Sequence, residues 1–141
     1  MKFVVVTGGF DPIHSGHIDY IREAATLGDV LIVGVNSDEW LTRKKGKPFM
    51  NWEERTTVVN ALRYVDFVLK FNDDDDSACS LLEDLKRSWI GKGDEIIFAN
   101  GGDRNSTNNR ESKVEGITFV YGVGGSNKKN SSSDILKAWK E

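Results

Sequence analysis

The sequence predicts an α/β protein whose core is a five-stranded parallel β-sheet flanked by helices. Short apolar runs alternate along the chain with segments in which apolar residues recur at helical spacing. The first apolar run has the composition of a strand that is buried on both faces, as strands of parallel sheets are. Because a helical segment separates the first two runs, they are expected to pair in parallel through a right-handed crossover.

Five apolar runs are expected to form the strands of this sheet. The first consists mainly of β-branched and aromatic residues and ends at the pair Gly8 and Gly9, which marks a turn. Strand and helix alternate throughout the chain, which supports a parallel sheet. The expected strands are Lys2–Thr7, Asp29–Asn36, Asp66–Phe71, Glu95–Ala99 and Thr118–Tyr121.

Four segments are expected to form helices around the sheet. The first has apolar residues at helical spacing and a stop signal at Gly28. The second begins at a capping residue, Asn51, and has Glu54 at its third helical position, the pattern of a capping box. The expected helices cover Gly16–Leu27, a segment from Asn51 through Leu62, a segment from Ser77 or Ser80 through Trp89, and Ser132–Trp139.

Four further segments have the composition of loops. Residues 101–116 and 122–130 are polar and contain glycines, and long loops of this kind are often functional. The run Asp73–Asp76 is expected to be a solvated loop rather than a metal site, because four consecutive carboxylates cannot all face one ion. The basic run Arg43–Lys47 would by itself also be solvated, but its charge suits a polyphosphate.

Length and charge limit the classes of function. With 141 residues, the chain is expected to form one domain, residues 1–141, around one core. A net charge of −3 at pH 7 offers no basic face to DNA or RNA, so no nucleic-acid partner is expected. The longest apolar run, Val30–Val35, is far shorter than the roughly twenty residues that cross a bilayer, so no membrane partner is expected.

The cysteine content favours a reducing compartment. Cys79 is the single cysteine, which excludes an internal disulfide. The apolar stretch at the N-terminus is too short for a signal peptide and lacks a cleavage site. Together these observations predict a cytoplasmic protein.

The segment Gly9–His17 carries the strongest chemical signal, because it lies where the first strand turns into the first helix. Ligands of open parallel sheets bind outside the carboxyl ends of the strands, and a helix N-terminus there attracts phosphate. His14 and His17 are three positions apart, so they are expected on one helical face, where both reach the same polyphosphate. The segment therefore predicts a phosphate site.

Within this segment, His14-Ser15-Gly16-His17 is similar to the His-x-Gly-His signature of the nucleotidyltransferase superfamily related to class I aminoacyl-tRNA synthetases. The order of motifs along nearly the whole chain resembles the branch of glycerol-3-phosphate cytidylyltransferase and heptose-1-phosphate adenylyltransferase. The further matching motifs are Leu27-Gly28-Asp29, Val35-Asn36-Ser37-Asp38, Glu54-Arg55, Tyr64-Val65-Asp66, Gly101-Gly102-Asp103 and Ser131-Ser132-Ser133. The resemblance implies a Rossmann-like fold and a nucleotidyltransferase activity.

The resemblance also implies the catalytic residues. His14 and His17 match the histidines that stabilise the pentacoordinate α-phosphate. Lys44 matches the lysine that neutralises the phosphates. Lys45 and Lys47 are close enough in the sequence to take this role instead, and the three lysines stay open as alternatives.

Binding residues are implied around these catalytic groups. Arg55 matches an arginine that holds the triphosphate or the substrate phosphate, and Lys47 is expected to assist substrate binding. The glycines of the site are expected to let the backbone or the nucleotide approach closely. The expected nucleotide-binding residues are Gly8, Gly9, Phe10, Asp11, Gly16, Asp103, Ser131, Ser132 and Ser133. Mg²⁺ is expected to arrive with the triphosphate rather than to occupy a metal site of the protein.

The reaction implied is transfer of a nucleoside monophosphate from CTP or ATP to a phosphorylated alcohol or sugar phosphate, with release of pyrophosphate. The choice of nucleotide stays open, because Ser126 stands where the cytidylyltransferase branch has an arginine. The acceptor also stays open among glycerol 3-phosphate, a sugar 1-phosphate and a phosphorylated amino alcohol. The alternative function is a regulator that binds nucleotide on the same fold without turnover. A homodimer is expected from the resemblance alone.

Overall fold

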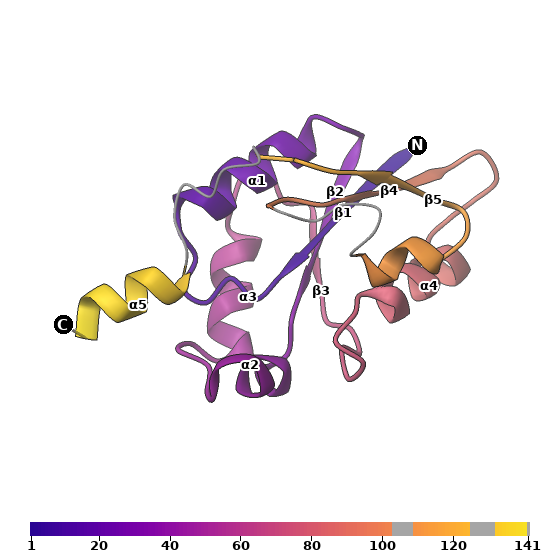
Figure 1. Ribbon diagram of the computed structural model, residues 1–141. Helices are drawn as coiled ribbons and strands as arrows, with labels where there is room; N and C mark the ends of the chain where they lie inside the picture. Colours follow the sequence, from indigo (N-terminus) through magenta and orange to yellow (C-terminus); the bar gives the residue numbers. More distant parts are fainter. Residues whose placement is uncertain (103–108, 125–131, 141) are drawn as a thin grey trace.

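The computed structural model describes residues 1–102, 109–124 and 132–140. Across these ranges the chain forms one parallel sheet of five strands, in the order β3-β2-β1-β4-β5 (Figure 1). The strands are β1 (Lys2–Gly8), β2 (Val30–Val35), β3 (Phe67–Leu69), β4 (Glu95–Ala99) and β5 (Ile117–Val120). The predicted Rossmann-like α/β fold with a parallel sheet is confirmed.

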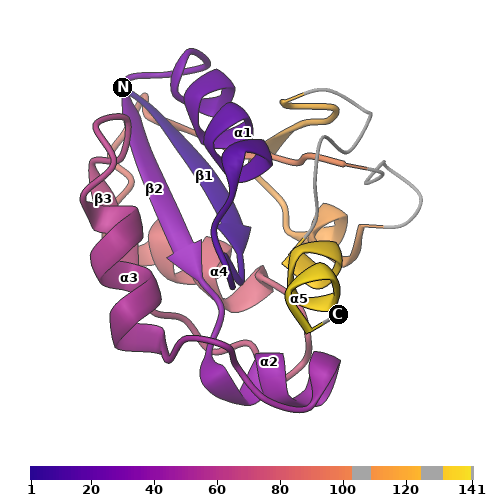
Figure 2. The same cartoon turned by 90° about the vertical axis from the view of Figure 1, so that its left-hand side faces the viewer.

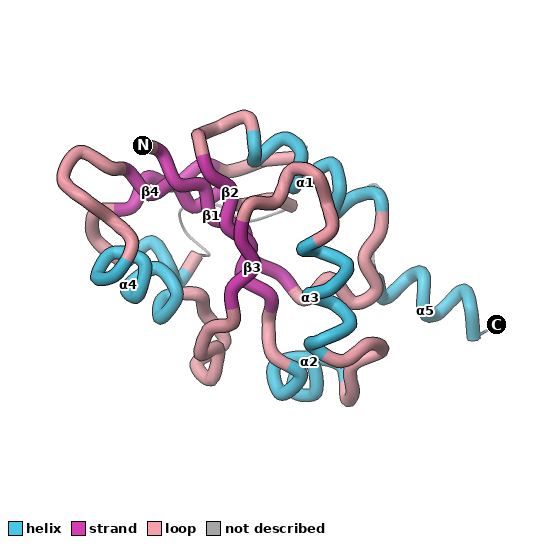
Figure 3. Tube along the Cα trace, turned by 180° about the vertical axis from the view of Figure 1, so that it is seen from behind, coloured by secondary structure: helices cyan, strands magenta, loops and turns pink. Residues whose placement is uncertain are grey.

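Helices cover both faces of this sheet. Figure 3 shows α1 and α3 on one side of the strands and α4 on the other. In the described ranges the helices are α1 (Ser15–Ala25), α2 (Asp38–Lys45), α3 (Trp52–Asn60), α4 (Cys79–Ser88), the short 3₁₀-helix η1 (Arg110–Lys113) and α5 (Ser132–Lys140).

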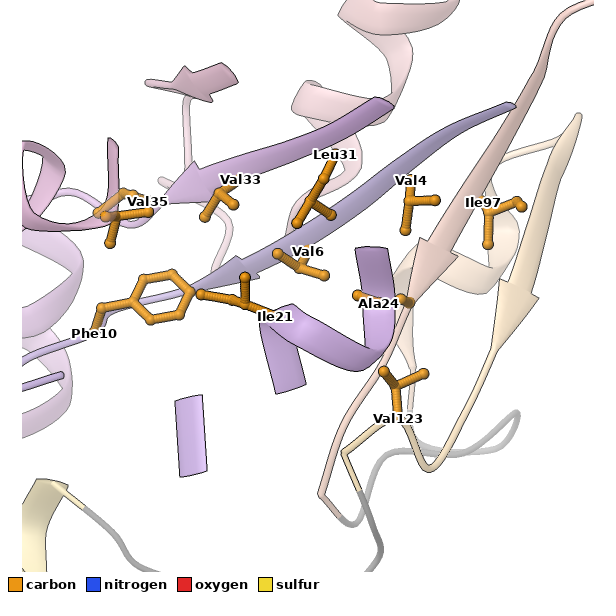
Figure 4. Packing of buried hydrophobic residues seen from close by; sticks show 12 residues of the cluster. Val4, Val6, Phe10, Ile21, Ala24, Leu31, Val33, Val35, Ile97 and Val123 are labelled. Atoms are coloured by element: carbon orange, nitrogen blue, oxygen red, sulfur yellow. The ribbon is translucent and has the colours of Figure 1, made fainter. Parts of the chain in front are cut away.

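The central strand β1 sends successive side chains to opposite faces of the sheet, and each face has its own core. Val4 and Val6 pack with Ile21 of α1 on one face (Figure 4). Val5 packs with Leu82 of α4 on the other face. Each of these fully buried side chains stabilises the fold by about 1.5–3 kcal/mol. The continuous apolar composition of β1 follows from this burial on both sides.

The order of the strands indicates where in the sheet a ligand would bind. Val4 of β1 pairs with Leu31 of β2 on one side and with Ile97 of β4 on the other. The chain first extends the sheet from β1 through β2 to β3, and then returns to the opposite side of β1 with β4 and β5. The order therefore reverses between β1 and β4, and ligands of such sheets bind at the carboxyl ends of the strands at this reversal.

Helix α2 was not expected from the sequence, which suggested a basic loop after β2. Ser37 caps this helix, and its Oγ accepts a hydrogen bond from the N–H of Trp40 at 3.0 Å. The first turn is acidic and the last turn is basic, and both charges suit the helix dipole. Most of the basic run, Arg43 to Lys45, therefore lies on a helix with a defined direction.

The N-terminus of α4 also differs from the prediction. Ala78 occupies the cap position and has no side-chain acceptor. Ser77, one of the two expected caps, accepts from the N–H of Cys79 at 3.2 Å. The buried carboxylate of Glu111 accepts from the N–H of Ala78 at 2.7 Å. The sequence did not reveal this second acceptor, because it lies 33 positions away along the chain.

Helix α5 projects from the body of the molecule (Figure 1). None of its residues is buried, and Trp139 is 80% exposed. Among the residues that the structure describes, no helix is long and apolar enough to cross a membrane.

Candidate active site

The β1–α1 turn and helix α2 meet at the carboxyl ends of β1 and β2. Figure 2 shows α2 below the two strands, at the end toward which their arrows point. The N–H of Asn36 donates to the carbonyl of Gly8 at 2.9 Å, so the first residues after β2 stay close to the end of β1. The predicted site residues on both segments therefore share one edge of the sheet.

The two histidines of the predicted motif lie together at the N-terminus of α1. His14 is the cap residue, and its Nδ1 accepts from the N–H of Gly16 at 3.1 Å. The Nδ1 of His17 accepts from the N–H of His14, also at 3.1 Å. The two rings are stacked with their centroids 3.8 Å apart. The two side chains come together as expected, but not as positions on one helical face, because His14 precedes the first helical residue, Ser15, and has an extended backbone.

These contacts define the tautomers of both rings. Because Nδ1 accepts a hydrogen bond in His14 and in His17, each neutral ring carries its proton on Nε2. Each of the two rings therefore has an N–H donor of the kind that binds phosphate oxygens. The side chains also satisfy N–H groups at the start of the helix that the sequence analysis had expected to bind phosphate directly.

Phe10 and the preceding glycines have packing roles that differ from the expected contact with nucleotide. The ring of Phe10 is buried and meets the ring of His17 edge to face, with centroids 5.0 Å apart. A Cβ on Gly8 would lie 3.1 Å from the ring of Phe10, and a Cβ on Gly9 would lie 3.0 Å from Leu41. The glycines thus let the turn pack against the protein's own side chains.

Asp11 uses its carboxylate inside the protein. The side chain is buried and accepts from the N–H of Phe49 at 2.6 Å and of Met50 at 2.7 Å. The Nζ of Lys45 lies 3.0 Å from the same carboxylate and donates to the carbonyl of Asp11 at 2.6 Å. Asp11 therefore joins the β1–α1 turn to the loop between α2 and α3.

The three candidate lysines have different surroundings. Lys45 is paired with Asp11, as described above. The Nζ of Lys44 lies 4.7 Å from the ring centroid of Trp40, over the ring. The same ring lies 3.4 Å from the position that a Cβ on Gly9 would take, so Trp40 links Lys44 to the glycine turn. Lys47 is exposed after the end of the helix.

Arg55, expected to bind a phosphate, is fully buried and faces protein oxygens. Its Nη1 donates to the carbonyls of Gly9 at 2.9 Å and of Asn36 at 2.7 Å. Its Nε donates to the carbonyl of Met50 at 2.9 Å, and its Nη2 donates to the carboxylate of Asp38 at 2.6 Å. Arg55 thus ties together the ends of β1 and β2, helix α2 and the loop before α3.

The serine motif approaches the site through one residue. The Oγ of Ser132 donates to the carbonyl of Pro12 at 2.7 Å, which brings the start of α5 to the β1–α1 turn. Ser133 is exposed on the same helix. Asp103 and Ser131 lie outside the residues that the structure describes.

Tyr20 is a residue at this edge that the sequence analysis missed. Its hydroxyl donates to the carbonyl of Ala99 at the end of β4. A Cβ on Gly101 would lie 3.2 Å from the ring, and a Cβ on Gly124 would lie 2.9 Å from the Tyr20 backbone. The glycines allow α1 to pack against the segments that follow β4 and β5. In the sequence, Tyr20 could not be distinguished from an ordinary packing residue of the helix by its spacing alone.

Fold and site together define the class of protein. Two stacked imidazoles lie at the carboxyl edge of a parallel sheet, near a helix that ends in lysines, and such an arrangement of donors and positive charge suits a polyphosphate. The chain therefore has the fold and the site of a protein that binds polyphosphates. Residues 5–138 match the model of the family described as Cytidylyltransferase-like, and the chain belongs to this family.

Two curated relatives are similar to the chain over nearly its whole length. It is 35% identical over 143 residues to the bifunctional protein HldE of Geobacter sulfurreducens, covering 99% of this chain and 28% of the relative. It is 37% identical over 146 residues to the bifunctional protein HldE of Campylobacter jejuni, with the same coverage of 99% and 28%. The chain therefore spans just over a quarter of the length of these relatives.

Solved structures share the fold at lower identity. A lipopolysaccharide core biosynthesis protein from Thermoplasma volcanium superposes with a TM-score of 0.68 at 22% identity, over 92% of this chain and 99% of the other. A bifunctional NMN adenylyltransferase/ADP ribose pyrophosphatase from Francisella tularensis superposes with a TM-score of 0.71 at 15% identity, over 99% and 42%. These similarities support the assignment of the fold.

Proposed function

We propose that the chain transfers a nucleoside monophosphate from a nucleoside triphosphate, ATP or CTP, to a phosphorylated alcohol or sugar phosphate. The observation that carries this proposal is the pair of stacked histidines, whose Nδ1 atoms are both occupied as acceptors. A sugar 1-phosphate with ATP is the first combination to test, because the motif order resembles the heptose-1-phosphate adenylyltransferase branch.

In the proposed reaction, a phosphate oxygen of the acceptor attacks the α-phosphorus. The bond from the α-phosphorus to the bridging oxygen of the β-phosphate breaks, and pyrophosphate leaves with the bonding electrons. The Nε2–H groups of His14 and His17 donate hydrogen bonds to the α-phosphate oxygens, whose negative charge rises in the transition state. Lys44 supplies positive charge at the phosphates. No covalent intermediate with the protein is needed, because the site contributes position and charge.

Arg55 and Asp11 contribute to this reaction by holding other groups in place. The guanidinium of Arg55 already donates to four protein oxygens, and the carboxylate of Asp11 already accepts two N–H groups. We therefore assign Arg55 to the geometry of the glycine turn rather than to direct phosphate binding. Lys47, which is exposed near this loop, remains the proposed contact for the substrate phosphate.

We further propose that Mg²⁺ binds together with the triphosphate. Mg²⁺ supplies further charge neutralisation when it is bound to the triphosphate oxygens. Among the residues that the structure describes, no group of three or more His, Cys, Asp or Glu side chains gathers to hold a metal ion. We also propose one domain over residues 1–141, a homodimer and a location in the cytoplasm.

The proposal is tested by measuring pyrophosphate release with Mg²⁺. Each of ATP, CTP, GTP and UTP is combined with glycerol 3-phosphate and with several sugar 1-phosphates. We expect release that needs both substrates and is lost in His17→Ala, while exchange of an exposed surface residue in Lys92→Ala leaves it unchanged. Nucleotide binding without turnover, with affinity unaffected by His17→Ala, would instead support the regulator.

A further inference from the structure

The acidic run after β3 is a loop whose residues Asp74 to Asp76 are exposed, as the sequence predicts, but its first residue departs from that prediction. Asp73, its first residue, is only 2% exposed. Its Oδ2 accepts from the amide of Asn36 at 3.0 Å and from the N–H of Ser37 at 2.8 Å. Its Oδ1 accepts from the hydroxyl of Ser37 at 2.7 Å. Both carboxylate oxygens are therefore used to hold the residues that connect β2 to α2.

The same run also binds the other end of α2. Arg43, in the last turn of the helix, donates through Nη2 to the carbonyl of Asp73 at 2.7 Å. The guanidinium of Arg43 also donates to the carboxylate of Asp76 at 3.0 and 3.2 Å. The cap Ser37 and Arg43 are six residues apart, about 9 Å along a helix axis. The turn Asp73–Asp76 thus runs beside α2 and contacts it near both ends.

Helix α2 in turn carries the lysines of the proposed site. Lys44 and Lys45 follow Arg43 directly, and Lys45 reaches the carboxylate of Asp11. Any tilt of α2 would therefore move the lysine ammonium groups relative to the histidines of α1.

From these contacts we infer that Asp73 is a positioning residue for nucleotidyl transfer. The turn Asp73–Asp76 acts as a brace that sets the orientation of α2, and through it the position of Lys44. The inference rests on the proposed function of the site. Arg55 holds the first turn of α2 independently, through Asp38 at 2.6 Å. Loss of the brace therefore misplaces α2 without detaching it.

The first test replaces Asp73 by asparagine and uses its exposed neighbour as a matched control. Asp73→Asn keeps the shape of the side chain but turns an amide N–H toward at least one of the donors on Asn36 and Ser37. We expect kcat to fall by about 10- to 100-fold, the size of effect that a small misplacement of a reacting group produces. Asp74→Asn, in the same run, is expected to leave kcat and both KM values unchanged. Equal rates in Asp73→Asn and wild type would overturn the inference.

A double-mutant cycle separates positioning from a general loss of stability. If Asp73 acts through Lys44, the rate of the double variant Asp73→Asn, Lys44→Ala should lie within about 3-fold of that of Lys44→Ala alone, because the two changes remove one effect. All rates are measured well below the unfolding midpoint of each variant. If the rate of the double variant instead falls by the product of the two single-variant losses, Asp73 does not act through Lys44.

Hydrogen exchange tests the brace without relying on turnover. We expect Asp73→Asn, and Arg43→Met at the other end of the brace, to speed the exchange of amides in α2 while α4 keeps its protection. Unchanged exchange in α2 would overturn the brace whatever the activity. Suppose that the wild-type protein releases no pyrophosphate across the substrate grid, while α2 exchanges faster in both variants as expected. This result would contradict the proposed function and the role of Asp73 in transfer, and would support only the structural role of the brace.

Discussion

The two halves of the candidate site are built in different ways. In the β1–α1 turn, the hydrogen bonds that orient His14 and His17 join residues two or three positions apart. Around α2, by contrast, Arg55, Lys45 and Asp73 contact partners as far as 46 positions away. These contacts of the two histidines are therefore set by local sequence, whereas the contacts around α2 form only when the sheet and its crossovers are complete.

The largest expected effect tests the half that depends on distant contacts. Arg55→Met removes a buried guanidinium and leaves the carbonyls of Gly9 and Asn36 without a donor. We expect the free energy of unfolding to fall by about 3–5 kcal/mol, because each buried acceptor that is left without a donor costs about 1–3 kcal/mol. Urea denaturation followed by circular dichroism measures this loss.

The matched control for Arg55 is an arginine on the surface. Arg87 has a side chain that is 69% exposed, and it pairs with Asp84 of its own helix. Arg87→Met should change the free energy of unfolding by no more than about 1 kcal/mol. Similar losses in the two variants would contradict the central place assigned to Arg55.

These different origins explain how much the sequence alone could predict. The order of the strands and of helices α1, α3, α4 and α5 follows from periodicity, and the proximity of His14 and His17 follows from their spacing of three residues, but helix α2 was missed. The roles of Asp11 and Arg55 were expected at the ligand, because a motif specifies a residue type but not the direction in which its side chain points. Asp73 was assigned to solvent, because only the folded sheet brings it to Ser37.

The second prediction tests the half of the site formed by the β1–α1 turn. His17→Ala removes one of the two Nε2 donors, and we expect kcat to fall by about 100- to 1,000-fold, as when one oxyanion donor is lost. The fold should lose about 1–2 kcal/mol, because the deleted side chain caps the N–H of His14 and packs against the rings of Phe10 and His14. Pyrophosphate release and urea denaturation measure the two quantities. A loss of stability as large as that of Arg55→Met would mean that His17 is as important for the fold as Arg55, and would contradict the difference between the two halves.

The third prediction concerns the contact that joins the two halves. Lys45→Met removes a charged hydrogen bond to Asp11, and the free energy of unfolding is expected to fall by about 1–2 kcal/mol. Lys47→Met, two positions away and exposed, should stay within about 0.5 kcal/mol of the wild type. Thermal or urea unfolding compares the two variants. Equal stability of both would show that Lys45 does not link α2 to the β1–α1 turn.

The smallest expected effect is a dependence on pH in the brace beside α2. The hydroxyl of Ser77, at 2.8 Å, and its N–H, at 3.0 Å, hold the pKa of Asp75 below the ordinary value of an aspartate. A carboxyl group whose pKa is lower in the folded state stabilises the fold above its unfolded pKa. This stabilisation is lost as the pH falls through the folded pKa. The effect is small because Asp75 is exposed to solvent.

Asp75→Asn isolates this contribution. The difference in unfolding free energy between the wild type and this variant should be largest near neutral pH and should shrink steadily in acid, when measured by urea denaturation at each pH. A difference for Asp75→Asn that stays constant into strong acid would mean that Ser77 stabilises the turn without favouring the charged form of Asp75.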